Sequence, residues 1–191
     1  ISPRYGIIHS GNFHGDYVAL EMDKLKIAVT KLSLLLERQI NFLCNSRLNA
    51  LLPPFVTLGT PGLDLGLQGL QFVATSTAAE NQTLSMPMSI HTIPTNNDNQ
   101  DIVSMGTNAA LMTSRIVENT YQIQAILFMA ILQAVEYLEI KNRLGKGTRD
   151  MYETIRRILP PFKKDYPLLY KNIAVLSSEI KKLAVQRYQQ A

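Results

Sequence analysis

The longest uninterrupted helical pattern in the chain runs from Asp101 to about Asn142, and it limits the possible folds more than any other feature. It contains no proline, and its only glycine, Gly106, lies near its start. Some forty helical residues at about 1.5 Å each make a rod of roughly 60 Å, twice the width of a small domain. Because a lone chain of 191 residues cannot cover such a rod, the pattern predicts a bundle of long antiparallel helices shared with other polypeptide.

Other segments also have helical periodicity. Residues Asp16 to about Asn45, with Asp16 as the expected N-cap, carry apolar residues at spacings of three and four. They predict an inward stripe of Val18, Met22, Leu25, Val29, Leu32, Leu36, Ile40 and Leu43. A helix rich in small residues is expected from about Leu63 to Leu84, and two shorter ones over 148–159 and from Pro167 onward.

A single short strand is expected at the N-terminus. Tyr5, Ile7 and Ile8 precede the turn-forming run Ser10-Gly11-Asn12. Two-stranded pairing is marginal even when both strands are present, so this strand needs a partner from upstream sequence or from another chain. The expected fold is therefore all-α, a long antiparallel helix bundle with a short β segment at its N-terminus.

Composition excludes several classes of protein. A hydrophobic content of 46% with 18% charged residues indicates a packed globular chain rather than a disordered one. The net charge of +4 is spread over the surface after Lys141, whereas a nucleic-acid site needs basic residues gathered on one face. The apolar run from Ala125 to Leu132 is too short to span a membrane and predicts the buried middle of a bundle. Cys44 is the only cysteine, which excludes intrachain disulfides and indicates a reducing, cytoplasmic compartment.

The sequence offers no metal site. His9, His14 and His91 are the only histidines, and none has an acidic or cysteine ligand at a useful spacing. We expect all three to be structural. Glycine-rich phosphate loops and the nucleophile elbow of hydrolases are also absent from the sequence.

Two polar stretches and one helix face remain as candidates for a binding site. The first stretch is a glycine-flanked turn, residues 10–15, and the second is an amide-rich loop, residues 96–104. Gln100 and Asp101 are expected at a helix N-terminus, where free backbone N–H groups favour a carboxylate or another polar head. The alternative is a capping loop with exposed amides. With Gln68 and Phe72 on one helix face, these stretches could form a pocket with an apolar wall and a polar end.

Several blocks of residues together resemble one known family. In order and spacing they are similar to the C-terminal part of the aromatic amino acid ammonia-lyases, which include the histidine, phenylalanine and tyrosine lyases and related aminomutases. The resemblance covers nearly the whole chain and is strongest to the tyrosine and histidine lyases of the Bacteroidetes type. The matching blocks are Gly11-Asn12-Phe13-His14-Gly15-Asp16, Glu37-Arg38, Leu52-Pro53-Pro54-Phe55, Pro61-Gly62-Leu63, Ala79-Glu80-Asn81, Ile93-Pro94-Thr95 and Asn99-Gln100-Asp101-Ile102-Val103-Ser104-Met105-Gly106.

The resemblance implies a fold and a chemistry. The fold is the fumarase/aspartase-like helix bundle, a homotetramer whose active sites are each built from more than one subunit. The electrophile is a methylidene-imidazolone (MIO) formed from an Ala-Ser-Gly triplet. A base on a tyrosine-bearing loop removes a proton beta to the carboxylate, and ammonia leaves to give an arylacrylate. That proton is weakly acidic, which explains the need for a strong electrophile and a dry pocket.

The sequence departs from the family pattern at one decisive point. It contains no Ala-Ser-Gly triplet, and the family segments that carry the base tyrosine and the carboxylate-binding arginine are absent. We therefore expect residues 1–191 to be the C-terminal helical portion of a longer lyase, without its catalytic N-terminal half, and inactive alone.

The resemblance assigns roles to residues near the two polar stretches. Phe13 resembles the phenylalanine that packs beside the prosthetic group, with Asn12 holding the turn. Gln100 occupies the position where histidine lyases commonly have glutamate and where phenylalanine and tyrosine lyases have glutamine. This favours tyrosine over histidine as substrate, because an imidazole gains more from a carboxylate partner than a neutral ring does.

Four more residues resemble lining positions of the family pocket. Asn96 and Asn99 resemble residues of the same wall as Gln100, whereas Gln68 and Phe72 resemble the helical wall that faces the substrate ring. The expected reaction is deamination of tyrosine to coumarate, or of histidine to urocanate, within a larger enzyme.

Three alternatives remain. One is an aromatic aminomutase, and another is a helical assembly module without catalytic function. The third is the fumarase and argininosuccinate lyase group, whose loop ends in Met-Pro-x-Lys. The run Ser85-Met86-Pro87-Met88 is similar, but Ser89 stands where the lysine is required, which argues against it.

Overall fold

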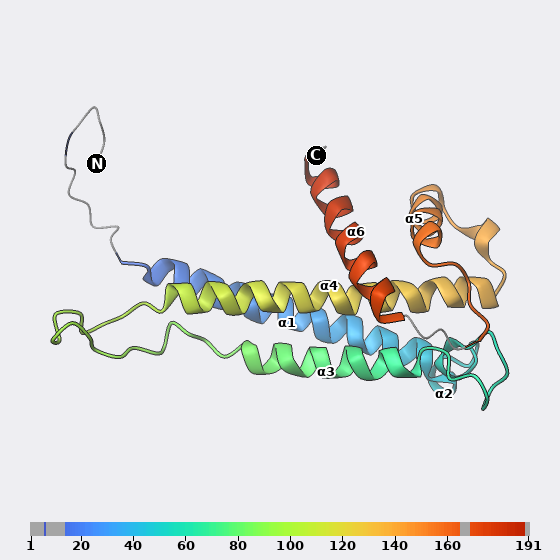
Figure 1. Ribbon diagram of the computed structural model, residues 1–191, viewed down its shortest axis with the longest axis horizontal. Coiled ribbons are helices and arrows are strands. Elements are labelled where there is room, and N and C mark those ends of the chain that lie inside the picture. Colours follow the sequence, from blue (N-terminus) through green and yellow to red (C-terminus); the bar gives the residue numbers. More distant parts are fainter. Residues whose placement is uncertain (1–5, 7–13, 165–168, 190–191) are drawn as a thin grey trace.

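The computed structural model describes residue 6 and residues 14–164 and 169–189, and these form helices and connecting turns (Figure 1). The all-α class is confirmed. The expected strand at Tyr5, Ile7 and Ile8 lies outside the described residues. The helices are α1 (Asp16–Cys44), α2 (Ser46–Asn49), α3 (Gln68–Leu84), α4 (Gly106–Tyr137), α5 (Lys146–Ile158) and α6 (Leu169–Gln189), with 3-10 turns η1 (Pro54–Val56) and η2 (Lys141–Arg143).

Three long helices form the body of the molecule. Helices α1 and α4 run in the same direction, and α3 runs antiparallel between the same two ends (Figure 1). Helices α5 and α6 lie against the second half of α4. The segment that joins α3 to α4 extends beyond the ends of the helices on the side where α1 begins (Figure 1).

The long central helix is shorter than its sequence pattern predicts. It begins at Gly106 rather than Asp101 and ends at Tyr137, so its 32 residues span about 48 Å. The preceding residue, Met105, has a left-handed φ of 52°, which stops the helix from extending backwards. At the far end Glu139 also has a positive φ, of 53°.

Two other helix starts also differ from the predicted ones. Helix α3 begins at Gln68 rather than Leu63, because Gly66 turns the chain with a φ of 54°. A Cβ at Gly66 would lie 2.7 Å from the carbonyl oxygen of Phe55, so only glycine fits. In α1 the N-cap is Gly15, and Asp16 is the first helical residue rather than the cap. Its carboxylate still favours the helix start through the dipole.

The face that α1 buries is not the predicted one. Val18, Leu25 and Leu32 of the expected apolar stripe are 54%, 42% and 49% exposed. Of that stripe only Ile40 is fully buried. The buried residues of α1 are instead Ala19, Asp23, Lys26, Thr30, Ser33, Glu37, Ile40 and Cys44.

Hydrogen bonds explain why this polar face turns inward. Asn81 of α3 donates from Nδ2 to Thr120 Oγ1 of α4 at 3.3 Å and accepts from Asn119 Nδ2 at 2.9 Å. Its backbone carbonyl accepts from Thr30 Oγ1 of α1 at 3.3 Å. Further along α1, the buried carboxylate of Glu37 accepts from Thr75 Oγ1 at 3.0 Å. Because these polar groups satisfy one another, burial costs them little.

The apolar core lies along the C-terminal half of α4. The run Ala125 to Leu132 is largely buried there, as the sequence predicts, although Ile131 remains 38% exposed. Side chains of α5 and α6 complete this core, including Tyr152, Ile155, Ile173, Leu176 and Ile180. No helix in the described part of the chain is long and apolar enough to cross a bilayer.

The polar network predicts a measurable stability effect. Replacing Asn81, which is fully buried, by leucine of similar size removes its bonds to Asn119 and Thr120. We expect Asn81→Leu to lower the free energy of unfolding by about 1–3 kcal/mol in urea denaturation. The matched change Gln82→Leu, at the exposed neighbouring position, should alter it by less than about 0.5 kcal/mol. Equal effects of the two variants would contradict a structural role for the network.

Candidate functional site

The amide-rich loop forms a tight hairpin instead of a helix start. Thr95 N donates to Gln100 O at 3.0 Å, and Gln100 N donates to Thr95 O at 3.3 Å. Between them Asn96, Asn97 and Asp98 all have left-handed φ values, of 56°, 52° and 61°. Asparagine and aspartate tolerate this conformation better than other non-glycine residues. The prediction that Gln100 lies at a helix N-terminus is therefore wrong, because α4 begins only at Gly106.

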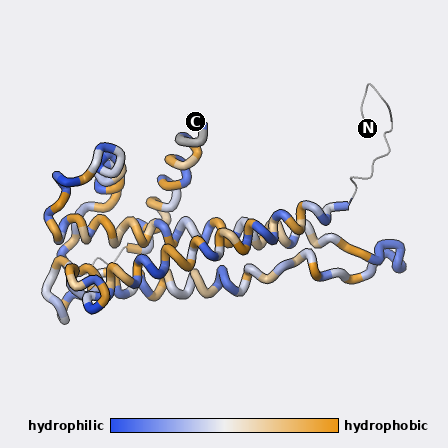
Figure 2. Tube along the Cα trace, turned by 180° about the vertical axis from the view of Figure 1, so that it is seen from behind, coloured by the Kyte–Doolittle hydropathy of each residue, from blue (hydrophilic) through white to orange (hydrophobic). Residues whose placement is uncertain are grey.

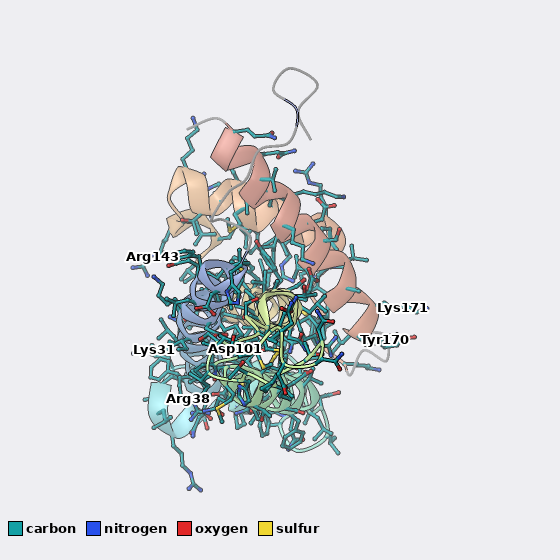
Figure 3. All side chains as sticks on the ribbon, turned by 90° about the vertical axis from the view of Figure 1, so that its left-hand side faces the viewer. Lys31, Arg38, Asp101, Arg143, Tyr170 and Lys171 are labelled. Carbon is teal, nitrogen blue, oxygen red and sulfur yellow. The ribbon has the colours of Figure 1, made fainter. Side chains whose placement is uncertain are left out.

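The tip of this hairpin is open to solvent. Asn96, Asn99, Gln100 and Asp101 are all exposed. Figure 2 shows the hydrophilic tip beyond the helix ends. Viewed along the bundle in Figure 3, Asp101 lies over the middle of the helix ends, and the labelled basic side chains lie on the flanks. The three amides can therefore meet a ligand or another polypeptide placed against this end of the bundle.

The end of the hairpin contacts the start of α1. His14 Nε2 lies 3.0 Å from Ile102 O, and a Cβ on Gly15 would lie 3.1 Å from Ser104 Oγ. On the other side, a Cβ on Gly106 would lie 3.1 Å from Gly15 O. The described end of the first polar stretch, His14 and Gly15, thus adjoins the second stretch. Asn12 and Phe13 lie outside the described residues, so their predicted roles stay predictions.

The start of the same segment is held by a buried ion pair of α1. Lys26 Nζ lies 2.7 Å from Asp23 Oδ1 and donates to Met86 O at 2.7 Å. Asp23 accepts from the backbone N–H groups of Met88 at 3.0 Å and Ser89 at 2.7 Å. Both side chains are buried, with 4% of Asp23 and none of Lys26 exposed. We call this pair the Asp23–Lys26 clamp.

The clamp keeps the Asp23 carboxylate ionised. Burial by itself raises the pKa of this carboxyl, but the Lys26 ammonium and the N–H groups of Met88 and Ser89 favour the charged form more strongly. Together they lower the pKa of Asp23 from 3.8 to about 2.

Gln68 and Phe72 lie far from the hairpin. They belong to the first turns of α3, near the C-terminal end of α1, where Gln71 Nε2 of α3 donates to Asn41 Oδ1 at 3.1 Å. Asn41 is roughly 40 Å along α1 from Gly15, at about 1.5 Å per residue. The expectation that Gln68 and Gln100 border one hollow within a single chain is therefore wrong. Phe72 is 68% exposed, so its ring faces outward.

Several cavities of the described structure lie away from the hairpin, and one of about 520 Å³ is lined in part by Leu70 and Val73 of α3, close in sequence to Gln68 and Phe72. One of about 410 Å³ is lined by Thr57, Glu136, Lys163 and neighbouring residues. Another of about 210 Å³ lies among α4, α5 and α6, beside Phe128 and Met151. Within the described residues, no three His, Cys, Asp or Glu side chains are grouped so as to bind a metal ion. His14 and His91 both contact backbone carbonyls, which is a structural role.

Comparison with known proteins decides the family. A family model described as aromatic amino acid lyase matches residues 2–157. The chain belongs to this family. It is 41% identical over 160 residues to a tyrosine 2,3-aminomutase of Chondromyces crocatus, covering 84% of this chain and 30% of that protein. It is 42% identical over 159 residues to a histidine ammonia-lyase of a Geobacillus species, covering 83% of this chain and 31% of that protein.

A solved structure agrees with the sequence comparison. The tyrosine aminomutase of Streptomyces globisporus superposes with a TM-score of 0.89 at 36% identity, covering 98% of this chain and 35% of that one. The chain therefore spans about a third of the length of the relatives it matches. The lyase and aminomutase helical fold predicted from the resemblance is confirmed.

The described residues of this family member do not by themselves form a site for a prosthetic group. The sequence contains no Ala-Ser-Gly triplet from which such a group could form. The described part of the glycine-rich turn, His14 and Gly15, contacts the hairpin through a ring nitrogen and a backbone surface.

Sequence reasoning did not find the contacts that hold the hairpin. Asp23 and Lys26 are three residues apart, but so are Glu21 and Lys24, whose pair is about 60% exposed on the same helix. The spacing alone does not distinguish the two pairs. Thr92, whose Oγ1 accepts from Val103 N at 2.8 Å, gave no signal beyond its place in a loop.

The lowered pKa of Asp23 predicts a pH dependence of stability. In the unfolded chain Asp23 takes up its proton near pH 3.8, but in the folded chain only near pH 2. The stabilisation is therefore complete above about pH 4 and is lost as the pH falls toward 2. We expect the difference in unfolding free energy between the wild type and Asp23→Asn, from urea titrations at several pH values, to shrink across this range. A difference that stays constant would exclude ionised Asp23 as its cause.

Proposed function

We propose that the protein is part of an enzyme that deaminates an aromatic L-amino acid without oxidation, tyrosine first and histidine second. The amino acid loses ammonia from its α carbon and a proton from its β carbon, leaving an arylacrylate, coumarate or urocanate. The activity belongs to a longer protein, and we expect residues 1–191 alone to be inactive.

The observation that carries this proposal is the hairpin at the end of the bundle. It presents the amides of Asn96, Asn99 and Gln100 on a short loop held against the start of α1. An amide can donate its N–H groups to a carboxylate, and it can donate to or accept from a phenol hydroxyl. The neutral Gln100 favours a phenol over an imidazole, because a carboxylate there would pair better with a protonated imidazole.

The prosthetic group of the proposed enzyme would come from upstream sequence. One relative is named an MIO-dependent tyrosine 2,3-aminomutase. When bound, such a group supplies the electrophile that captures the substrate. The part of the site in this chain would contribute Phe13 and Asn12 beside it and the hairpin amides toward the substrate.

A homo-oligomer, a tetramer by resemblance, would bring the separated residues together. Gln68 and Phe72 lie at the opposite end of α3 from the hairpin, so they could face a substrate only at the hairpin of another copy. The exposed apolar residues of α1 support such an assembly, because large exposed apolar surfaces are typical of protein interfaces. They are Tyr17, Val18, Leu20, Leu25, Ile27, Leu32, Leu35 and Phe42.

An aminomutase is the second candidate. Relatives at about 40% identity are named tyrosine 2,3-aminomutases, and such an enzyme returns the amino group to the β carbon instead of releasing it.

A cytoplasmic location is also part of the proposal. The single cysteine supports it, and burial raises the pKa of the Cys44 thiol to about 12, so it stays protonated and unreactive.

Activity of the protein expressed from its full reading frame tests the proposal. Purified protein incubated with L-tyrosine should release coumarate, seen as a rise in ultraviolet absorbance, with one ammonia per arylacrylate. Histidine should react more slowly, to urocanate. Formation of β-tyrosine without net ammonia would establish the aminomutase instead. Turnover of neither amino acid would contradict both.

A single variant tests the role of Gln100. We expect Gln100→Glu to shift the ratio of kcat/KM values toward histidine by about tenfold, since a carboxylate binds an imidazolium more strongly. The neighbouring change Asp98→Asn at the exposed tip serves as the control and should leave the ratio unchanged.

The proposed assembly predicts an effect of charge on the apolar face of α1. The double variant Leu25→Glu/Leu32→Glu places two carboxylates on this face, and we expect it to dissociate the oligomer in sedimentation velocity measurements. The change Asn142→Glu, at an exposed position after α4, should leave the oligomer intact. An intact oligomer in the double variant would show that this face of α1 is not an interface.

A further inference from the structure

The Asp23–Lys26 clamp contacts a different part of the chain from most other buried polar groups of α1. Most buried polar groups of α1 face α3 or α4, as Thr30 and Glu37 do. Asp23 and Lys26 instead contact the turn that follows α3, through the backbone of Met86, Met88 and Ser89. The pair therefore holds mainly main-chain atoms of that turn, with the Ser89 side chain as a further partner of Asp23.

A buried ion pair is weak evidence for a role in stability. Removing two charges from water costs several kcal/mol each, and apolar residues of similar volume are often as stable or more so. The exposed pair of Glu21 and Lys24 on the same helix shows the usual solvated alternative. The clamp bonds to Met86, Met88 and Ser89 of a single turn. These bonds indicate that the clamp contributes to the conformation of that turn.

The turn held by the clamp leads directly into the hairpin. Beyond it, residues 90–102 are all exposed, so few packing contacts hold them. Hydrogen bonds join this segment to α1 and to the residues just before it at two places, the clamp at its start and the His14 contact at its end. Within the segment, Thr92 Oγ1 accepts from Val103 N at 2.8 Å and joins the two arms. The direction of the hairpin is thus set where its arms meet α1.

We propose that Asp23 and Lys26 are positioning residues that hold the hairpin, and with it Asn96, Asn99 and Gln100, in the orientation that meets the substrate. This proposal rests on the proposed function for the identity of the ligand, but the orienting contact itself does not. Neither side chain touches the substrate. The clamp acts by placing the backbone from which the amides project.

The orientation of the hairpin can be measured without any substrate. Spin labels on Asp98→Cys at the tip and Ser114→Cys on the exposed surface of α4 report the hairpin direction as a distance distribution. The protein is expressed from its full reading frame, any cysteine other than Cys44 is replaced by serine, and labelled protein is diluted with unlabelled protein. Cys44 is buried, so it should not take up label.

The clamp variant is Asp23→Leu/Lys26→Met, which replaces the pair with apolar side chains of similar size and leaves no charge buried without a partner. We expect it to broaden the distance distribution at least twofold, with circular dichroism unchanged. The matched control Glu21→Leu/Lys24→Met makes the same substitutions at the exposed pair and should leave the distribution as in the wild type. An unchanged distribution in a folded clamp variant overturns the proposal. If the double variant fails to fold, the neutral pair Asp23→Asn/Lys26→Met, which leaves no charge buried without a partner, gives the same test.

Kinetics of the same variants test the consequence for the substrate. A hairpin that spends less time in the competent orientation binds substrate more weakly. We expect the clamp variant to raise KM at least fivefold and to change kcat less than twofold. A broadened distribution with an unchanged KM overturns a positioning role for the clamp. Failure of the proposed function is seen separately, as absence of turnover by the wild type.

Discussion

The polar side chains that α1 buries against α3 and α4 must each find a hydrogen-bond partner, because an unpaired buried polar group costs about 1–3 kcal/mol. Asn81, at the middle of the three-helix contact, meets this requirement with Thr30, Asn119 and Thr120 from both neighbouring helices. Partners of this kind exist only in one rotation of α1 about its axis. That rotation decides which of its faces is inside and which is left for other contacts.

The outward apolar face follows from the same rotation. With Asp23, Thr30 and Glu37 inside, Val18, Leu25 and Leu32 face solvent in the isolated chain. A helix with one polar face satisfied by its neighbours and one apolar face exposed is suited to the interior of a larger assembly. This arrangement agrees with a chain that spans about a third of its relatives' length and whose predicted site residues lie at opposite ends of α3.

The same helix face also connects the fold to the candidate site. At its N-terminal end the buried polar row of α1 ends in Asp23 and Lys26, which bind the backbone beyond α3 rather than a side chain of α3 or α4. The bundle and the amide hairpin are therefore parts of one hydrogen-bonded system. A shift of α1 would move both, and it would also disturb the apolar core, to which α1 contributes Ile40 and Cys44.

The sequence by itself determined the helices, the breaks between them and the family. Periodicity located α1 within one residue at its C-terminal end, and prolines and glycines separated the remaining helices. The blocks around Gly11 and Asn99 identified the lyases. Local pattern carries this information because helix formation and turn chemistry depend on near neighbours. The local pattern did not predict the hairpin, because Asn96, Asn97 and Asp98 permit three consecutive left-handed residues but do not require them.

Only the tertiary structure decided which face of α1 is buried and which ion pair is structural. Glu21–Lys24 and Asp23–Lys26 have the same spacing on the same helix. From the sequence alone, both pairs are expected to be solvated. Burial depends on what a distant segment places opposite each pair. The turn at Met86 to Ser89 offers a carbonyl and two N–H groups to the second pair and nothing to the first. Hydrogen-bond partners some sixty residues away in the chain are set by packing, and no local pattern encodes them.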